Sequence, residues 1–93
     1  MGEIERFITI QNELGLHARA AAKLVHIASQ YAVEIQIGKP DLMVNTKSIM
    51  GVLMLAAAKG TKLRLVATGD LETCESAVKA IEELVNGLFG EEK

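Results

Sequence analysis

The sequence places a histidine and an arginine at the start of a stretch that favours a helix. The stretch GLHARAAAKL covers residues 15–24, and His17 and Arg19 lie in its first half. If the helix begins at Ala18, His17 lies at or beside the N-cap, where backbone N–H groups lack intrahelical acceptors and the helix dipole adds positive charge. Such a position favours anions, phosphate in particular, and it favours the neutral, nucleophilic form of an imidazole.

Arg19 adds a fixed positive charge whose N–H donors suit phosphate oxygens. His17 and Arg19 together therefore supply a nucleophile, amide donors and a cation, a combination that indicates acceptance of a phosphoryl group. The alternative is an ordinary capping residue, because no second histidine and no orienting carboxylate lie nearby in the sequence, and no P-loop pattern occurs. Spacing alone leaves both interpretations open.

A second candidate stretch, VNTKSIMGVLML, covers residues 44–55. Ser48 stands where it can cap a short helix. The apolar side chains that follow are too many for one buried face, so some should be exposed as an adaptable docking surface. We expect Met50 and Leu53 to face outward and Val52 and Leu55 to face inward; the alternative is that the C-terminal helix buries all of them.

The elements that position these residues follow from hydrophobic periodicity. The predicted strands cover Ile4–Ile10, Val33–Ile37, Leu42–Val44 and Leu63–Ala67, with a turn at Gly38–Asp41. The predicted helices run from Ala18 to about Gln30, from Ser48 to Leu55 or as far as Ala58 with Gly60 ending it, and from an N-cap at Asp70 to about Leu88.

The element order is β-α-β-β-α-β-α, and each strand has one polar face. This pattern predicts an α+β open-faced sandwich, an antiparallel sheet with helices on one side. Periodicity alone does not separate it from a ferredoxin-like domain, which shares β-α-β-β-α-β. The 93 residues show no linker, repeat or low-complexity segment, so we expect one domain over residues 1–93.

Composition restricts the classes of function. The net charge of -2, with no basic run, disfavours nucleic acid as a partner. Cys74 is the only cysteine, so there is no internal disulfide, and no Cys/His spacing suggests a metal site. The N-terminus does not resemble a secretory signal, and the longest apolar stretch, Ile49–Ala58, is too short to span a bilayer. We expect a cytoplasmic protein without membrane insertion, metal or cofactor.

GLHAR before an alanine-rich helix, together with KSIMGV, resembles the HPr family over almost the whole chain. These are the histidine-containing phosphocarriers of the bacterial phosphoenolpyruvate-dependent sugar phosphotransferase system. The resemblance implies the strand order 1-4-2-3 with three helices on one face. It further implies that His17 takes a phosphoryl group on Nδ1 from enzyme I and passes it to IIA domains of sugar transporters. By the same resemblance Arg19 assists the transfer, and Ser48 is the serine phosphorylated by HPr kinase/phosphorylase.

Partners are expected to dock on the surface of the first two helices. The expected contact residues are Ala22, Lys23, His26, Lys47, Ile49, Met50 and Leu53. His26 should face solvent near the site, and Lys23 and Lys47 should add positive charge around it. A monomer suits such a carrier, and the final GEEK segment is expected to be frayed.

Ala20 stands where the family motif usually has proline. Alanine favours a helix, so the helix should form, and Ala20 adds an N–H that proline lacks. The departure leaves open a specialised regulatory paralogue, either a nitrogen-type relay or a regulator that works only through Ser48. A ferredoxin-like ligand-binding module is the third class of function.

Overall fold

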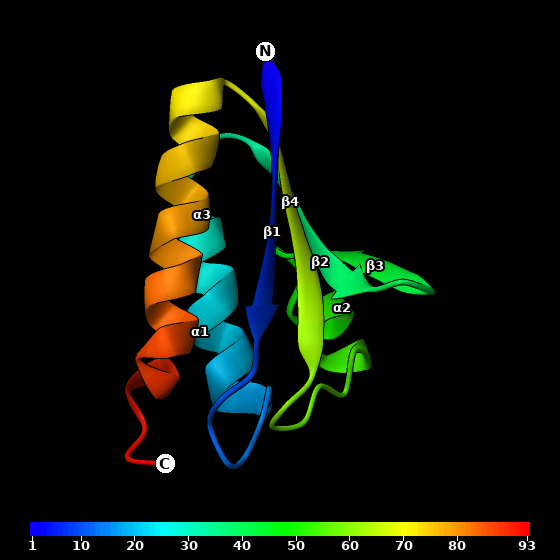
Figure 1. Ribbon diagram of the computed structural model, residues 1–93, viewed down its shortest axis with the longest axis vertical. Helices are drawn as coiled ribbons and strands as arrows, with labels where there is room; N and C mark the ends of the chain where they lie inside the picture. The colour runs from blue at the N-terminus through cyan, green and yellow to red at the C-terminus, as the bar shows by residue number, and fades with distance from the viewer.

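A four-stranded antiparallel sheet with helices packed on one face forms the structure, a computed structural model that describes residues 1–93 (Figure 1). The strands are β1 (Gly2–Thr9), β2 (Glu34–Lys39), β3 (Leu42–Asn45) and β4 (Lys62–Gly69), in the order β1-β4-β2-β3. The helices are α1 (Ala18–Ala28), α2 (Ile49–Met54) and α3 (Leu71–Asn86), followed by a short 3-10 turn, η1 (Leu88–Gly90). The predicted fold class and strand order are confirmed.

Alternation along the strands decides which face of the sheet the helices cover. In the central strand β4, Leu63, Leu65 and Ala67 are buried, whereas Lys62 and Arg64 are exposed on the other face. β1 pairs with β4 so that its own buried residues lie opposite buried residues of β4. One face is therefore apolar and the other polar, as expected for a sheet that is covered on one side only.

α1 and α3 lie side by side over the apolar face (Figure 1). Small residues allow α1 to approach closely, since Ala20, Ala21 and Ala28 are completely buried together with Leu24. Burying one large aliphatic side chain contributes about 1.5–3 kcal/mol. The aliphatic core thus holds α1 against the sheet. None of the helices has both the length and the apolar character needed to cross a bilayer.

Some element boundaries differ from the prediction. β2 continues through Gly38 to Lys39, because a Cβ at Gly38 would lie only 2.0 Å from the Leu42 carbonyl oxygen, and glycine alone lets the hairpin strands approach so closely. α2 ends at Met54 and does not reach Ala58. Ala56 takes a positive φ of 48°, which stops the helix, and Gly60 lies in the turn before β4.

The other boundaries differ from the predicted ones by only one or two residues. β1 covers Gly2–Thr9 instead of Ile4–Ile10, because pairing with β4 begins at Gly2. α1 ends at Ala28 and α3 at Asn86, each about two residues before the predicted end. Side-chain periodicity continues past the last hydrogen-bonded turn, so it places helix ends less well than cap residues do.

The prediction of a frayed C-terminus is wrong. Leu88 and Phe89 take positive φ values of 59° and 55° and bend the chain back, and Phe89 is completely buried. We call residues 89–93 the C-terminal strap. It lies beside the loop between β1 and α1, where the Glu13 N–H donates a hydrogen bond to the Lys93 carbonyl oxygen at 3.1 Å (Figure 1). Burial of Phe89 anchors a segment whose composition suggested only a solvated tail.

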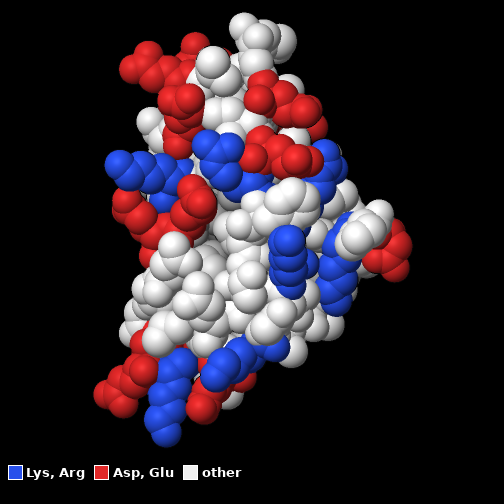
Figure 2. Space-filling model, in the orientation of Figure 1, with Lys and Arg blue, Asp and Glu red and all other residues white.

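Acidic residues lie at both ends of the molecule in Figure 2. Figure 2 shows Asp and Glu clustered around the end where α3 begins, whereas a large uncharged area lies below them. α1 begins at the opposite end, where the C-terminal strap also lies (Figure 1). The acids around the start of α3 are therefore remote from the start of α1, where a separate set that includes Glu13 and Glu91 lies.

Candidate functional site

His17 is the N-cap residue of α1, as the sequence predicted. Its backbone is extended, with φ -71° and ψ 175°, and its carbonyl oxygen accepts the Ala21 N–H at 2.9 Å. The Nδ1 atom of its imidazole accepts the backbone N–H of Arg19 at 3.3 Å, a long hydrogen bond. The side chain is 29% exposed. Nδ1 thus faces the Arg19 amide of the first turn, on a ring that solvent still reaches.

The loop before α1 is fixed by backbone contacts that aim His17. Gly15 has a φ of 68°, and a Cβ there would lie 2.5 Å from the Ala57 carbonyl oxygen. That same oxygen accepts the Leu16 N–H at 2.9 Å. The buried Asn12 amide donates to the Gly15 carbonyl oxygen at 2.9 Å. Only glycine fits at position 15, so the G of GLHAR sets the approach of the chain to the helix.

A carboxylate from the far end of the chain meets the other nitrogen of the imidazole. Glu91 Oε2 forms a hydrogen bond with Nε2 of His17, and Glu91 Oε1 accepts the Asn12 side-chain amide at 2.9 Å. The bond from His17, and secondarily that from Asn12, lowers the pKa of the Glu91 carboxyl. Glu13 is the acid nearest to His17 in sequence, but the bend after α3 brings Glu91 to the ring instead. Sequence reasoning missed Glu91, and no local pattern indicates it.

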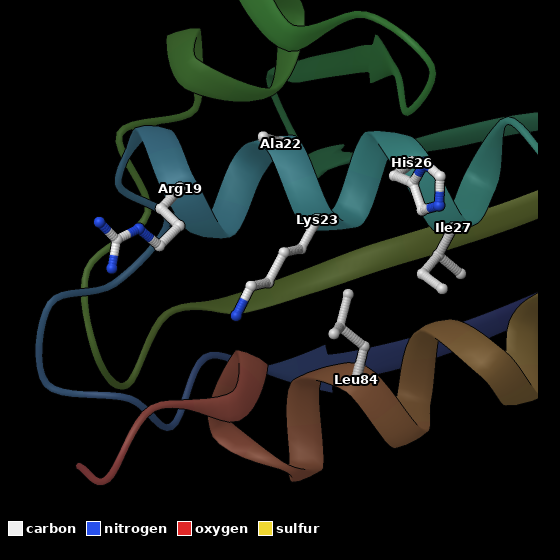
Figure 3. Close-up of a pocket in the computed structure, with 6 residues that line it drawn as sticks. All are labelled: Arg19, Ala22, Lys23, His26, Ile27 and Leu84. Carbon is white, nitrogen blue, oxygen red and sulfur yellow. The ribbon is translucent and has the colours of Figure 1, made fainter.

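Two cations of α1 flank the site and behave differently. Arg19 is exposed, and Figure 3 shows its side chain extended away from the helix. Lys23 crosses towards η1, where its Nζ donates to the Phe89 carbonyl oxygen at 2.6 Å (Figure 3). Both line an open hollow of about 350 Å³ between α1 and α3, with Ala22, His26, Ile27 and Leu84. Arg19 is therefore the freer of the two to meet an anion.

His26 and Ala22 lie on the solvent side of α1, as predicted. His26 is two helical turns beyond Arg19, and its Nε2 lies 3.2 Å from the Gln30 side-chain nitrogen. His26 therefore belongs to the surface beside the site and not to the immediate surroundings of the His17 ring.

Ser48 is the N-cap of α2, and its Oγ accepts the Gly51 N–H at 3.1 Å. Lys47 next to it does not lie beside His17. Its Nζ donates to the Tyr31 carbonyl oxygen at 2.7 Å, beyond the C-terminal end of α1. The expectation that Lys47 adds positive charge around the imidazole is wrong, because this bond holds it at the other end of the helix.

The apolar side chains of α2 divide between core and surface. Val52 and Leu55 are buried and Met50 is 71% exposed, which confirms the predicted orientation of these three. Leu53 does not face outward fully; it is half-buried and packs against the core. Ile49 and Met54 are also exposed. α1 and α2 pack against each other, so these exposed side chains belong to a helix that neighbours α1.

Residues 4–87 match the protein family described as PTS HPr component phosphorylation site. The chain belongs to the HPr family. It is 51% identical over 85 residues to phosphocarrier protein HPr of Pseudomonas aeruginosa, a match that covers 90% of this chain and 92% of that protein. It is 40% identical over 91 residues to phosphocarrier protein NPr of Shewanella violacea, covering 98% of each. The crystal structure of HPr-C-His from Thermoanaerobacter tengcongensis has a TM-score of 0.87 and 43% identity, with full coverage of both chains.

Membership of the HPr family makes this protein a phosphocarrier of the phosphotransferase system. It also agrees with the fold, since the matched span contains GLHAR, KSIMGV and all four strands apart from the first residues of β1. The roles of the individual residues rest on the geometry described above.

Proposed function

We propose that this HPr-family protein accepts a phosphoryl group on Nδ1 of His17 from phosphorylated enzyme I and passes it to IIA domains of sugar transporters. The observation that carries the proposal is the position of Nδ1, which accepts the Arg19 amide of the first turn on a ring whose side chain is 29% exposed. A protein donor can reach such a ring, and the amides lie where phosphoryl oxygens need donors.

In the transfer, the Nδ1 lone pair forms the new N–P bond while the bond between phosphorus and the donor breaks and its electron pair leaves with the donor. The 3.3 Å bond from the Arg19 N–H to Nδ1 is given up, and that N–H becomes available to a phosphoryl oxygen. The Arg19 guanidinium adds charge-assisted donors. Onward transfer to a IIA domain reverses these changes.

The docking surface combines the exposed side of α1 with the start of α2. Ala22, Met50 and Ile49 supply exposed apolar contacts, and Arg19 supplies a positive rim. Such a surface suits brief encounters, in which a small apolar centre gives contact and charge gives the rate of association.

Ser48 is proposed as a regulatory phosphorylation site. A phosphoryl group there adds about 1.5–2 negative charges at the start of α2, beside Ile49 and Met50. This charge would weaken docking to an acidic partner surface by repulsion. Ser48→Asp should therefore slow transfer from enzyme I. An unchanged rate would contradict the proposed mechanism of charge repulsion.

A nitrogen-type relay is the second candidate, supported by the similarity to NPr and by Ala20 in place of the usual proline. α1 begins at Ala18 with Ala20 fully buried in its first turn, so the replacement leaves the helix intact. Separate labelling by the enzyme I of the sugar system and by its nitrogen-type counterpart would distinguish the two relays.

Incubation with labelled phosphoenolpyruvate and enzyme I, followed by acid, tests the proposal. We expect acid-labile label on the native protein and none on His17→Ala. Acid-stable label from a parallel incubation with ATP and a serine kinase, with no label from enzyme I, would indicate a regulator that works through Ser48. If neither the enzyme I of the sugar system nor its nitrogen-type counterpart labels the protein, the proposal of a phosphoryl carrier is contradicted.

A further inference from the structure

The C-terminal strap places a carboxylate on the side of the His17 ring opposite to the helix amides. We propose that Glu91 is a positioning residue, which holds the His17 proton on Nε2 and so keeps a lone pair on Nδ1 directed at the incoming phosphorus. This proposal rests on the proposed phosphoryl transfer at His17, and it adds a residue that the local motif does not contain.

The hydrogen bonds on the two sides of the ring define the same tautomer independently. Nδ1 faces an N–H donor, the amide of Arg19, so it must present a lone pair. Nε2 faces a carboxylate oxygen of Glu91, so it must carry the proton. Both contacts require a neutral ring protonated on Nε2, which leaves Nδ1 as the nucleophilic nitrogen.

The carboxylate is itself held in position. Asn12 is completely buried, and its side-chain nitrogen donates both to Glu91 Oε1 and to the Gly15 carbonyl oxygen, each at 2.9 Å. Because both partners are acceptors, the orientation of this amide is fixed. Asn12 thus links the carboxylate to the loop that aims His17, while the bonds from His17 and Asn12 lower the pKa of Glu91 and keep it ionised at neutral pH.

The strap that carries Glu91 is anchored on both sides of the site. The Phe89 side chain is completely buried, and its carbonyl oxygen accepts the Lys23 Nζ at 2.6 Å. At the other end, Lys93 accepts the N–H of Glu13 at 3.1 Å. Glu91 therefore lies between two attachment points, which is the arrangement expected of a group that orients another.

The contact also fits the charge that develops in the transfer. When neutral His17 attacks through Nδ1, the N–P bond forms, the donor leaves with the electron pair, and the ring becomes positively charged with its proton still on Nε2. The Glu91 carboxylate stabilises this charge, and no proton has to leave. A ring that stays protonated is also the better leaving group when the phosphoryl passes on to the acceptor.

Glu91→Gln tests the proposal, with Glu92→Gln as the matched control, because Glu92 is the neighbouring, exposed acid. Rapid-mixing measurement of phosphoryl uptake from enzyme I gives the rate, and long-range ¹H–¹⁵N correlation spectra of the unphosphorylated protein give the tautomer of His17. For Glu91→Gln we expect a decrease in rate of about 10- to 100-fold, as for orienting partners of metal-bound histidines. We also expect a smaller population of the tautomer protonated on Nε2, and no change in either measurement for Glu92→Gln.

A native protein protonated on Nδ1, or a Glu91→Gln variant with the native tautomer population, would overturn the positioning role. So would a Glu91→Gln variant that takes up phosphoryl at the native rate. The spectra need no phosphoryl donor, so this result is separate from the labelling of His17. If the native protein shows the expected tautomer but takes up no phosphoryl group, the proposed function fails and the orienting contact stands.

Discussion

The starts of α1 and α3 meet the same backbone requirement with different side chains. Asp70 caps α3, and its carboxylate accepts the Thr73 N–H at 3.0 Å and the Thr73 hydroxyl at 2.7 Å. His17 caps α1, and its Nδ1 accepts the Arg19 N–H at 3.3 Å. The α3 cap consists of two hydrogen bonds to an ionised carboxylate, whereas the α1 cap is a single, longer hydrogen bond to an imidazole. The weaker cap is the one that an incoming phosphoryl group can replace.

The second residue of each helix also differs in charge between α1 and α3. In α3 this residue is Glu72, which favours a helix start; in α1 it is Arg19, and the first turn contains no acid. A positive charge at a helix N-terminus opposes the dipole and costs roughly 0.3–1 kcal/mol. The acidic residues at the start of α3 thus stabilise the helix dipole. The start of α1 lacks this stabilisation, and its positive charge remains available to bind an anion.

The largest expected effect comes from giving α1 a purely structural cap. His17→Asn should abolish acid-labile labelling, because the amide caps helices well but supplies no nucleophilic nitrogen. The free energy of unfolding should change by less than about 1 kcal/mol, since asparagine is a favoured N-cap. Labelling and chemical denaturation of the same preparation check both values. Label retained on the variant would place the acceptor elsewhere.

Arg19→Glu gives α1 the charge pattern of α3. Loss of the cation that faces the phosphoryl oxygens should slow uptake about 10²- to 10³-fold, the cost of losing one transition-state donor. The same change should stabilise the fold by about 0.3–1 kcal/mol through the dipole. Uptake kinetics and urea unfolding measure the two effects. A decrease in both rate and stability would contradict the idea that this helix start trades one for the other.

Asp70→Ala is the reciprocal change at α3. Removal of both bonds to Thr73 should lower the melting temperature by several degrees. Phosphoryl uptake should be unchanged, because α3 begins at the end of the molecule opposite to the start of α1 (Figure 1). Thermal melting followed by the labelling assay checks this pair. Slower uptake by the folded variant would show that the two helix starts are coupled.

What the sequence could predict depended on distance along the chain. The cap at His17, the cap at Asp70 and the orientations of Met50, Val52 and Leu55 were predictable, because each depends on residues a few positions apart. Glu91 was not, because its contact with His17 spans 74 positions and requires the left-handed bend at Leu88 and Phe89.

The prediction that Lys47 lies near the imidazole failed for a related reason. Lys47 is the first residue of the KSIMGV motif, next to Ser48, but the bond to the Tyr31 carbonyl oxygen fixes the lysine at the far end of α1. Membership of a motif does not fix where a long side chain lies, because contacts with distant residues decide it. Direct contacts, such as those of Asn12, had to come from the structure.

The smallest expected effect is the response of the two helix starts to acid. Hydrogen bonds from His17 and Asn12 lower the pKa of Glu91 from its ordinary 4.5, and those from Thr73 lower the pKa of Asp70 from 3.8. A carboxyl whose pKa is lower in the folded state stabilises the fold above its unfolded pKa, and this stabilisation disappears as the pH falls through the folded value. The native protein should therefore lose more stability between about pH 5 and pH 3 than either Glu91→Gln or Asp70→Asn, as measured by urea unfolding at each pH. Parallel pH profiles for all three proteins would show that neither carboxylate is bound more tightly in the folded state, and the contrast between the two caps would then rest on geometry alone.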